Sequence, residues 1–374
     1  MTKKLPASVM AFALCQFMLA TDMIVKQKNG ETLRFDVKNV EEVIFEETIP
    51  ENSTVVDESE TPLKFKILSE NTVEVIVNRL YTKLSSVTIP TKVRINRKVY
   101  DVTSIENNAF SGCGSLTDIV IPESVTNIGA GAFDGCDKLK PELLVYDKGT
   151  KCYGWIGDKE KCTEVVVPEG VTSIENSAFE ACDSLNSIKI PESVTSIGAW
   201  AFYGCEKLKP ELLVYDKGTK CYGWIGDNKK CTEVVIPEGV TSIGKYAFNR
   251  CRNLTSVNIP ESVTSIEEYA FNGCDSLKPE LLIYDKGTKC YGWIGDKKKC
   301  TDVVIPEGVT SIEARAFYGC DSLTSISIPE EVTSIGNSAF DGCNSLNSIK
   351  IPKGVTSIGS FAFASCRSLT SVDI

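Results

Sequence analysis

One stretch of the sequence decides the fold: Leu116-Thr-Asp-Ile119-Val-Ile121-Pro122-Glu-Ser-Val125-Thr-Asn-Ile128-Gly-Ala-Gly-Ala132-Phe133-Asp-Gly-Cys136. Its isoleucines at positions 119 and 121 stand two residues apart, as on one face of a half-buried strand. The proline that follows cannot donate to a strand ladder, so it ends this strand. The pair at 125 and 128 predicts a second short extended segment, and Ala-Phe at 132–133 begins the return turn.

The pattern recurs with a period of 23 residues. Cys113 and Cys136 are 23 residues apart, and from there to Cys366 the intervals between cysteines of this pattern are 23 or 46 residues. A single coil of this length cannot bury its apolar side, but stacked coils can. We therefore predict a leucine-rich-repeat solenoid of 23-residue coils with short parallel strands.

The repeat resembles a known family. Ile190-Pro-Glu-Ser-Val-Thr-Ser-Ile-Gly198, followed by Ala201-Phe-Tyr-Gly-Cys205, is similar to the BspA-like (treponemal-type) leucine-rich-repeat surface proteins. The resemblance covers residues 62–374. It implies a secreted or cell-surface protein of the adhesion type, which binds host proteins or other cells and has no enzymatic activity. It names no particular partner.

The predicted domain organisation has four parts. Lys3 and Lys4 precede a largely apolar run, so residues 1–20 are expected to be a signal peptide, with lipidation of Cys15 left open. Residues 21–47 are expected to form a small β-hairpin module around Asn29-Gly30, a strong hairpin signal. An acidic linker over 48–61 then leads to the solenoid over 62–374, of which 62–115 are a lead-in segment.

Composition excludes several classes of function. The chain has 374 residues and a net charge of −10, which argues against a nucleic-acid partner because phosphates require a basic face. It contains no histidine, so Ser-His-Asp and Cys-His catalysis are excluded and the commonest metal ligand is missing. No later apolar run approaches the ~20 residues of a membrane span. We expect no enzymatic activity, cofactor, metal or transmembrane helix.

A second period of 69 residues lies above the first. Leu143-Leu-Val-Tyr-Asp-Lys-Gly-Thr-Lys-Cys-Tyr-Gly-Trp-Ile-Gly157 recurs almost unchanged from Leu212 and from Leu281, so every third turn is atypical. Pro141-Glu142 replaces part of the usual strand, and we expect a bulge or a one-residue slip there.

The atypical turns carry the candidate binding residues. Each has a tyrosine and a tryptophan two residues apart, followed by a lysine-bearing loop. The candidates are Tyr153, Trp155, Tyr222, Trp224, Tyr291, Trp293, Lys297, Lys298 and Lys299. Aromatic side chains beside cations are typical of interface hot spots, and regular recurrence gives avidity for extended ligands.

Two other interpretations of this surface stay open. Trp155 aligns with Ala109 and Ile156 with Phe110, so these segments can instead be another way to fill a coil. The exposed face of the strands is a further candidate for weak protein or glycan recognition, because it is small and polar. Its members are Asn186, Ser187, Lys189, Thr255, Ser256, Asn258, Thr324, Ser325 and Ser327.

The cysteines fall into two groups. Nine occupy the same place, one per ordinary turn, and we expect a ladder of free thiols rather than disulfides. The other six form the pairs Cys152/Cys162, Cys221/Cys231 and Cys290/Cys300, for which a disulfide within the turn stays possible. Because Cys152 aligns with a glycine position, or with the core isoleucine position if the register slips by one, its orientation is open.

Two functional hypotheses result. The first is a non-catalytic, secreted or surface-attached solenoid that binds extracellular proteins or glycans. The second is a structural or assembly protein of the cell envelope that uses the solenoid as a spacer. The sequence stops at Ile374 in mid-strand, so we also expect a homodimer through the open last coil.

Overall fold

The computed structural model describes residues 5–6, 22–26, 32–36, 45–46 and 55–373. In the N-terminal part, β2 (Asp22–Lys26) pairs antiparallel with β3 (Thr32–Asp36), and β1 (Leu5–Pro6) pairs parallel with β4 (Phe45–Glu46). The expected signal peptide lies outside the described residues except for β1. The expected linker is described only from residue 55 onward.

The solenoid begins with a mixed sheet that covers its first turn. The order in this sheet is β5 (Val55–Asp57), β9 (Lys92–Ile95), β10 (Lys98–Ile105), β7 (Thr72–Val75) and β6 (Phe65–Ile67). The 3-10 helices η2 (Glu58–Glu60) and η3 (Arg79–Lys83) lie between these strands in the chain. Tyr81 is fully buried, and its ring stacks on Phe110 of the first regular turn with centroids 5.1 Å apart.

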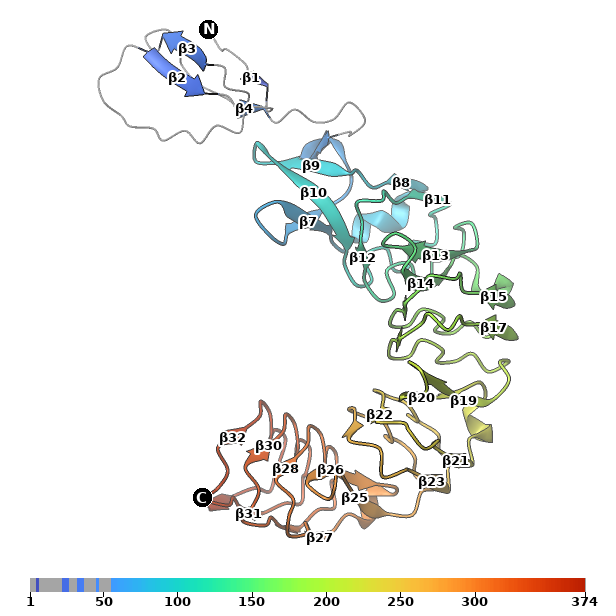
Figure 1. The fold of residues 1–374 in the computed structure, drawn as a ribbon, viewed down its shortest axis with the longest axis vertical. Coiled ribbons are helices and arrows are strands. Elements are labelled where there is room, and N and C mark those ends of the chain that lie inside the picture. The colour runs from blue at the N-terminus through green and yellow to red at the C-terminus, as the bar shows by residue number, and fades with distance from the viewer. Residues whose placement is uncertain (1–4, 7–21, 27–31, 37–44, 47–54, 374) are drawn as a thin grey trace.

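From there the turns stack into a curved solenoid with a strand layer on each side (Figure 1). Two-residue Ser-Ile or Asn-Ile strands line the concave side. They are β12 (Asn127–Ile128), β16 (Ser173–Ile174), β18 (Ser196–Ile197), β22 (Ser242–Ile243), β24 (Ser265–Ile266), β28 (Ser311–Ile312), β30 (Ser334–Ile335) and β32 (Ser357–Ile358). The parallel register, such as Ile174 opposite Ile197, confirms the predicted offset of 23 residues.

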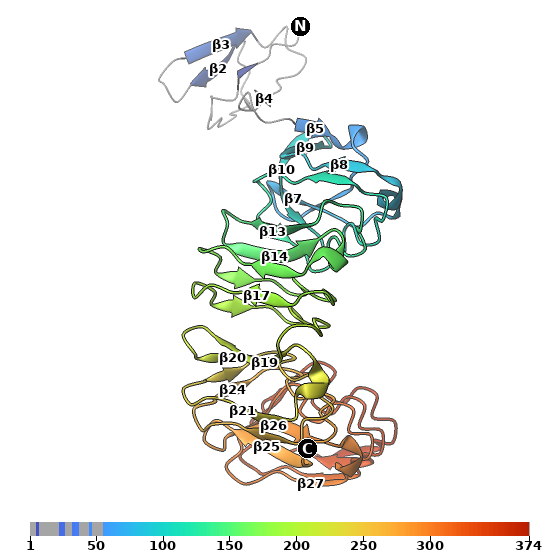
Figure 2. The same cartoon turned by 90° about the vertical axis from the view of Figure 1, so that its right-hand side faces the viewer.

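The convex side carries three-residue strands in parallel pairs (Figures 1 and 2). They are β8 (Ser86–Thr88), β11 (Asp118–Val120), β15 (Glu164–Val166), β17 (Ser187–Lys189), β21 (Glu233–Val235), β23 (Ser256–Asn258), β27 (Asp302–Val304), β29 (Ser325–Ser327), β31 (Ser348–Lys350) and β33 (Ser371–Asp373). The ladder breaks after β11, β17 and β23, where an atypical turn follows each pair.

Between the two layers, identical side chains stack turn upon turn. The rings of Phe179 and Phe202 are parallel with centroids 5.5 Å apart, and the same stacking recurs along the solenoid. The Cys205 thiol donates a hydrogen bond to the Phe179 carbonyl of the turn before it, at 3.0 Å. The fifteen cysteines in the described part of the chain are free, so the expected thiol ladder is present.

The atypical turns form hairpins, which the sequence reading did not predict. β13 (Glu142–Tyr146) pairs antiparallel with β14 (Lys151–Ile156), and a bulge lies between Leu144 and Val145. The equivalent hairpins are β19 (Glu211–Tyr215) with β20 (Lys220–Ile225), and β25 (Glu280–Tyr284) with β26 (Lys289–Ile294). The expected irregularity is therefore present, but it lies inside a hairpin that replaces the convex strand.

The hairpin also determines the positions of the cysteines in the three pairs, such as Cys152 and Cys162. Cys152 stands opposite Ile174 in the parallel register, so it takes the core isoleucine position. Cys162, by contrast, follows the 3-10 helix after the hairpin, and its side chain is fully buried in the same core cluster as Cys182 of the next turn. All six of these cysteines are free, so no bridge joins Cys152/Cys162, Cys221/Cys231 or Cys290/Cys300.

The buried core is divided into four clusters at the hairpins. The clusters run from Leu63 to Ile156, from Cys152 to Ile225, from Cys221 to Ile294 and from Cys290 to Ala362. After each hairpin a short 3-10 helix leads into the next turn. These helices are η4 (Lys159–Lys161), η5 (Asn228–Lys230) and η6 (Lys297–Lys299). Within the described ranges no helix has the length and apolar character needed to cross a membrane.

Candidate functional site

The tyrosines and tryptophans of the hairpins form the floor of the candidate site. In β20 the alternation of Lys-Cys-Tyr-Gly-Trp-Ile buries Cys221, Gly223 and Ile225 and turns Tyr222 and Trp224 to the other side, where both are half-buried. The Tyr222 hydroxyl donates to the Thr195 carbonyl at 2.9 Å, and Trp224 Nε1 donates to the Asp227 carbonyl at 3.3 Å.

The other two hairpins repeat this arrangement. Tyr153 and Tyr291 donate to Thr126 and Thr264, and Trp155 and Trp293 donate to Asp158 and Asp296. Burial raises the pKa of Tyr153 to about 12, so its hydroxyl remains a donor at neutral pH. The packing interpretation and the binding interpretation therefore both apply to these residues, which are anchored internally and still reach a surface hollow.

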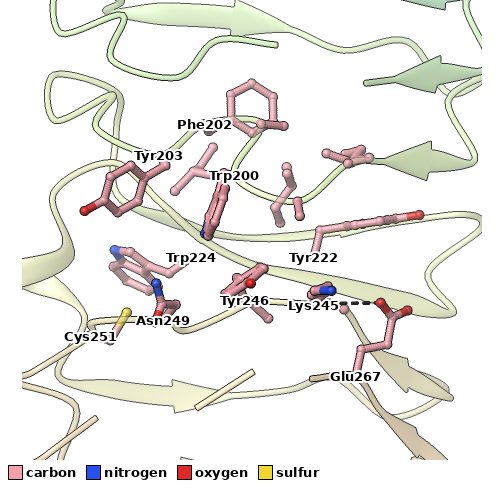
Figure 3. A pocket seen from close by; sticks show the side chains of 18 of the residues that line it. Trp200, Phe202, Tyr203, Tyr222, Trp224, Lys245, Tyr246, Asn249, Cys251 and Glu267 are labelled. Atoms are coloured by element: carbon pink, nitrogen blue, oxygen red, sulfur yellow. Dashed lines mark hydrogen bonds between the residues drawn. The ribbon is translucent and has the colours of Figure 1, made fainter. Parts of the chain in front are cut away.

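A hollow opens over each floor, so three hollows recur along the solenoid. The first lies over Tyr153 and Trp155 and spans about 420 Å³, including the solvent at its open mouth. Measured in the same way, the second, over Tyr222 and Trp224, spans about 710 Å³. The third, over Tyr291 and Trp293, spans about 540 Å³. Figure 3 shows the second hollow, with Trp200 and Tyr203 above and Trp224 and Tyr246 below.

The walls of the hollows come from a position that the sequence reading missed. This position immediately precedes the Ala-Phe pair and has a left-handed backbone in every turn of the repeat. Trp200, Tyr246, Tyr269 and Arg315 occupy it with φ between 59° and 61°. In the other turns the same position is Asn108, Gly131, Ser177, Ser338 or Phe361, and of these glycine and asparagine adopt this backbone most readily.

The wall residues touch one another and form a continuous strip. Ring centroids lie 4.4 Å apart between Trp200 and Tyr246, and 5.2 Å apart between Tyr246 and Tyr269. The Arg315 guanidinium lies 4.3 Å from the Tyr269 centroid, and Tyr318 meets the same ring edge-on at 5.8 Å. We call these five residues the aromatic strip. Trp200 is 42% exposed and Tyr318 is 37% exposed, so the strip is open to solvent at both ends.

Ion pairs hold the polar side chains beside the strip. Lys245 and Arg315 both contact the Glu268 carboxylate, at 3.1 and 3.4 Å. Lys220 contacts Glu267 at 3.1 Å. These contacts neutralise most of the charge next to the rings, which leaves a surface dominated by aromatic faces.

The three candidate lysines are placed differently from one another. Lys297 lines the third hollow, donates to the Tyr318 carbonyl and lies 5.6 Å from that ring's centroid. Lys298 and Lys299 are exposed on η6, away from the lining of the hollow. The structure therefore brings Lys297 together with Tyr291 and Trp293, but not Lys298 and Lys299.

The hollows bring together ring faces and hydrogen-bonding groups. Burial raises the pKa of the Cys221 thiol, whose strand forms the second floor, to about 12, so it stays protonated and unreactive. Among the described residues, no group of three or more Cys, Asp or Glu side chains is arranged to hold a metal ion. The arrangement is suited to binding through ring faces and hydrogen bonds.

Comparisons with known proteins agree with the repeat. Residues 36–140, 80–209, 225–281 and 295–374 match the BspA type leucine rich repeat region, in six copies. No curated protein matches the chain. A leucine rich cell surface protein from Faecalibacterium prausnitzii is 22% identical with a TM-score of 0.31, over 83% of this chain and 92% of that one.

Two further solved structures are leucine-rich repeat proteins. The protein from Bacteroides ovatus is 26% identical with a TM-score of 0.31, over 83% of this chain and 87% of that one. The protein from Eubacterium ventriosum is 22% identical with a TM-score of 0.42, over 81% of this chain and 92% of that one. Because the family's repeat region matches most of the sequence, the chain belongs to the BspA-type leucine-rich-repeat proteins.

Proposed function

We propose that this protein is a non-catalytic, secreted or cell-surface protein that binds extracellular proteins or glycans through its three hollows and the aromatic strip. One observation carries the proposal: the hollows have the same floor but different walls. Tyr-x-Trp is unchanged at 153–155, 222–224 and 291–293. The wall position that precedes Ala-Phe, in contrast, is Gly131 in the first hollow, Trp200 in the second and Tyr269 in the third.

The fold itself does not require these wall residues. A left-handed backbone favours glycine or asparagine, and a bulky aromatic residue there costs stability. Ser177 and Ser338 show that a small side chain serves the same turn elsewhere. Large rings placed at a strained and partly exposed position support a role in contact with a partner, since Trp and Tyr provide large contact area at interfaces.

Repetition supports a large or repetitive partner. Equivalent hollows recur every third turn, which at ~4.8 Å per turn places them ~14–15 Å apart. Contacts at successive hollows act together, so weak individual contacts give strong total binding to an extended ligand.

The test uses the full chain and a screen of extracellular-matrix proteins, plasma proteins and a glycan array. A strip variant, W200S/Y246S/Y269S, introduces the serine that the chain itself uses at this position. A control variant, K189S/N258S, changes the convex face to the residue found at Ser327. We expect saturable binding that falls at least tenfold in the strip variant and is unchanged in the control.

Two results would overturn the proposal. Loss of binding in the control variant alone would move the site to the polar convex face. A screen with no binding to any probe would remove the binding function and favour the envelope-spacer alternative. In that case deletion of the protein would alter the cell envelope instead.

A further inference from the structure

A cluster of cations lies next to the second hollow. Lys229, Arg250 and Arg252 are exposed and line a fourth hollow, together with Tyr203 and Asn253. This fourth hollow spans about 1380 Å³, including the solvent at its open mouth. We call these three cations the basic cluster. It places three positive charges on one surface of a chain whose net charge is −10.

The basic cluster is not neutralised by its neighbours. Among the described residues, no carboxylate lies within 4 Å of the charged groups of Lys229, Arg250 and Arg252, whereas many other lysines of the solenoid have such partners. Glu206 and Asp227 also line the hollow. Asp227 is already engaged, since its Oδ1 accepts from the Lys229 backbone amide at 2.9 Å.

The other copies of the 69-residue unit provide an internal comparison. In the second copy the residues that line the fourth hollow include three cations and two carboxylates. The equivalent positions of the first copy have one cation, Lys159, and five carboxylates. These carboxylates are Asp134, Asp137, Asp158, Glu160 and Asp183. The equivalent positions of the third copy have two cations, Lys297 and Lys298, and three carboxylates, Asp275, Asp296 and Asp321. The side chains at these positions therefore have a net negative charge in the first and third copies and a net positive charge in the second.

Arg250 occupies a position where most turns have glycine. Its φ is 62°; the equivalent residue is glycine in six turns (Gly112, Gly135, Gly204, Gly273, Gly319 and Gly342) and a small residue, Ala181 or Ser365, in two others, all with positive φ. Glycine adopts this backbone freely, while an arginine does so at a cost to folding because its Cβ approaches the following carbonyl oxygen. A cation kept at such a position points to a function for its charge.

The basic cluster is continuous with the aromatic floor of the second hollow. Tyr203 and Asn228 line both hollows. Arg250 Nη1 donates to the Tyr203 hydroxyl at 2.8 Å, which holds the guanidinium at the boundary. Asn253 Nδ2 donates to the Lys229 carbonyl at 2.9 Å and fixes the other edge. Figure 3 shows Tyr203 and Trp200 facing into the second hollow, beside Trp224.

We propose that this double hollow binds an acidic polysaccharide, with a sugar ring against the aromatic faces and a sulfate or carboxylate on the basic cluster. The inference rests on the proposed binding function and narrows its ligand class. Aromatic rings pack on the C–H faces of sugars, amide side chains such as Asn228 and Asn249 bond hydroxyls, and arginine pairs with anionic oxygens in a fork. A purely acidic peptide such as polyglutamate would satisfy the cations but offers no ring face to the aromatic half of the site.

The test measures binding of the full chain to four probes at low and high salt. Heparin is a sulfated polysaccharide, polygalacturonate carries carboxylates only, dextran is neutral and polyglutamate is an acidic peptide. The site variant R250G/R252D introduces the residues of the third copy, Gly319 and Asp321, so the backbone is retained and Gly relieves the strained φ. The control K189S/K298E makes the same change in net charge elsewhere.

We expect saturable binding of heparin or polygalacturonate that weakens at least tenfold in R250G/R252D and at high salt, and that persists in the control. Binding should also weaken in W200S, which removes a ring but no charge. Which of the two polysaccharides binds more tightly identifies sulfate or carboxylate as the recognised group.

Other results overturn the inference in distinguishable ways. Equal losses in the site and control variants would show non-specific attraction, and polyglutamate binding that survives W200S would indicate an acidic protein partner. Failure of all four probes, while the screen of matrix proteins, plasma proteins and other glycans still finds a strip-dependent partner, would refute the acidic polysaccharide and leave the binding function intact. If neither the four probes nor the wider screen shows binding, both the acidic polysaccharide and the proposed binding function are refuted.

Discussion

Trp200 and Tyr246 are separated by 46 residues and two turns of the solenoid, yet their ring centroids are 4.4 Å apart. The turn between them has Gly223 at the equivalent position, so no side chain separates the two rings. The hairpin glycine therefore has two roles. It lets the next turn approach closely, and it allows the aromatic strip to continue across the atypical turn.

Replacement of this glycine should break the stacking. A Cβ at Gly223 would lie 1.7 Å from the Ala247 carbonyl oxygen, which accepts from the Trp224 amide. We expect Gly223→Ala to lower the free energy of unfolding far more than Gly218→Ala. The latter has φ 81° and no atom within 4 Å of its Cβ, so only the backbone cost of about 1–2 kcal/mol applies. Urea unfolding followed by circular dichroism measures both, and equal losses would contradict the expectation.

Floor and wall residues should differ in their effect on stability. Trp224 packs on the core and donates an internal hydrogen bond, so Trp224→Ala should cost about 2–4 kcal/mol of folding free energy. Trp200 is 42% exposed on a strained backbone, so Trp200→Ser should change stability by less than about 1 kcal/mol. Chemical denaturation of the two single variants decides the matter, and similar losses in both would refute this division.

Stability should fall in alkaline solution. Burial raises the pKa of Cys152 to about 11 and that of Cys136 and Cys290 to about 12. In the unfolded chain these thiols titrate near pH ~8.5. The folded state therefore binds more protons above that pH, and the stabilisation present below it is lost as pH rises toward 12. The urea midpoint should be clearly lower at pH 10.5 than at pH 7, and less so in Cys152→Ala. A midpoint that is unchanged at pH 10.5 would exclude this coupling.

Thiol reactivity should report the packing of the ladder. Cys366 is half-buried, and the other fourteen cysteines of the described part are buried. In a Cys15→Ser background, we expect one thiol to react with an aromatic disulfide reagent at least tenfold faster than the rest in the native state. Mass mapping should assign it to Cys366. Rapid labelling of several thiols would show that the core opens readily.

The homodimer expected from the sequence stays a prediction, and the last turn shows how to test it. Ile358 and Val372 are 47% and 45% exposed, whereas the equivalent Ile335 and Ile349 of the turn before are 1% and 3% exposed. Light scattering should detect a dimer at about 100 µM that dissociates in I358K/V372K. A monomeric wild-type chain at this concentration would refute the dimer.

The fold was predictable because every turn repeats the same core. Positions such as Val171, Ile174 and Phe179 carry nearly the same side chain in each copy, so spacing alone reveals the register. The hairpins were predictable in principle, since Asp147-Lys148-Gly149 is a turn sequence between two alternating segments. That signal was outweighed by the period of 23 residues, which suggested one strand type throughout.

The candidate site was predictable only in its repeated half. Tyr222 and Trp224 attract attention because they recur, whereas Trp200, Tyr246 and Arg250 occur once each at positions that vary. The available signal was the size of these residues at places where other turns have glycine, serine or asparagine. Their contacts with one another depend on the left-handed backbone, which spacing alone does not reveal.

The division of the core at the hairpins has a mechanical consequence. Because each cluster is largely completed between one hairpin and the next, a pull on the chain should release one 69-residue block at a time rather than the whole solenoid. Each release would add about 240 Å of extended chain. A protein built in this way lengthens in steps under shear, and it keeps its remaining blocks folded while it absorbs the load.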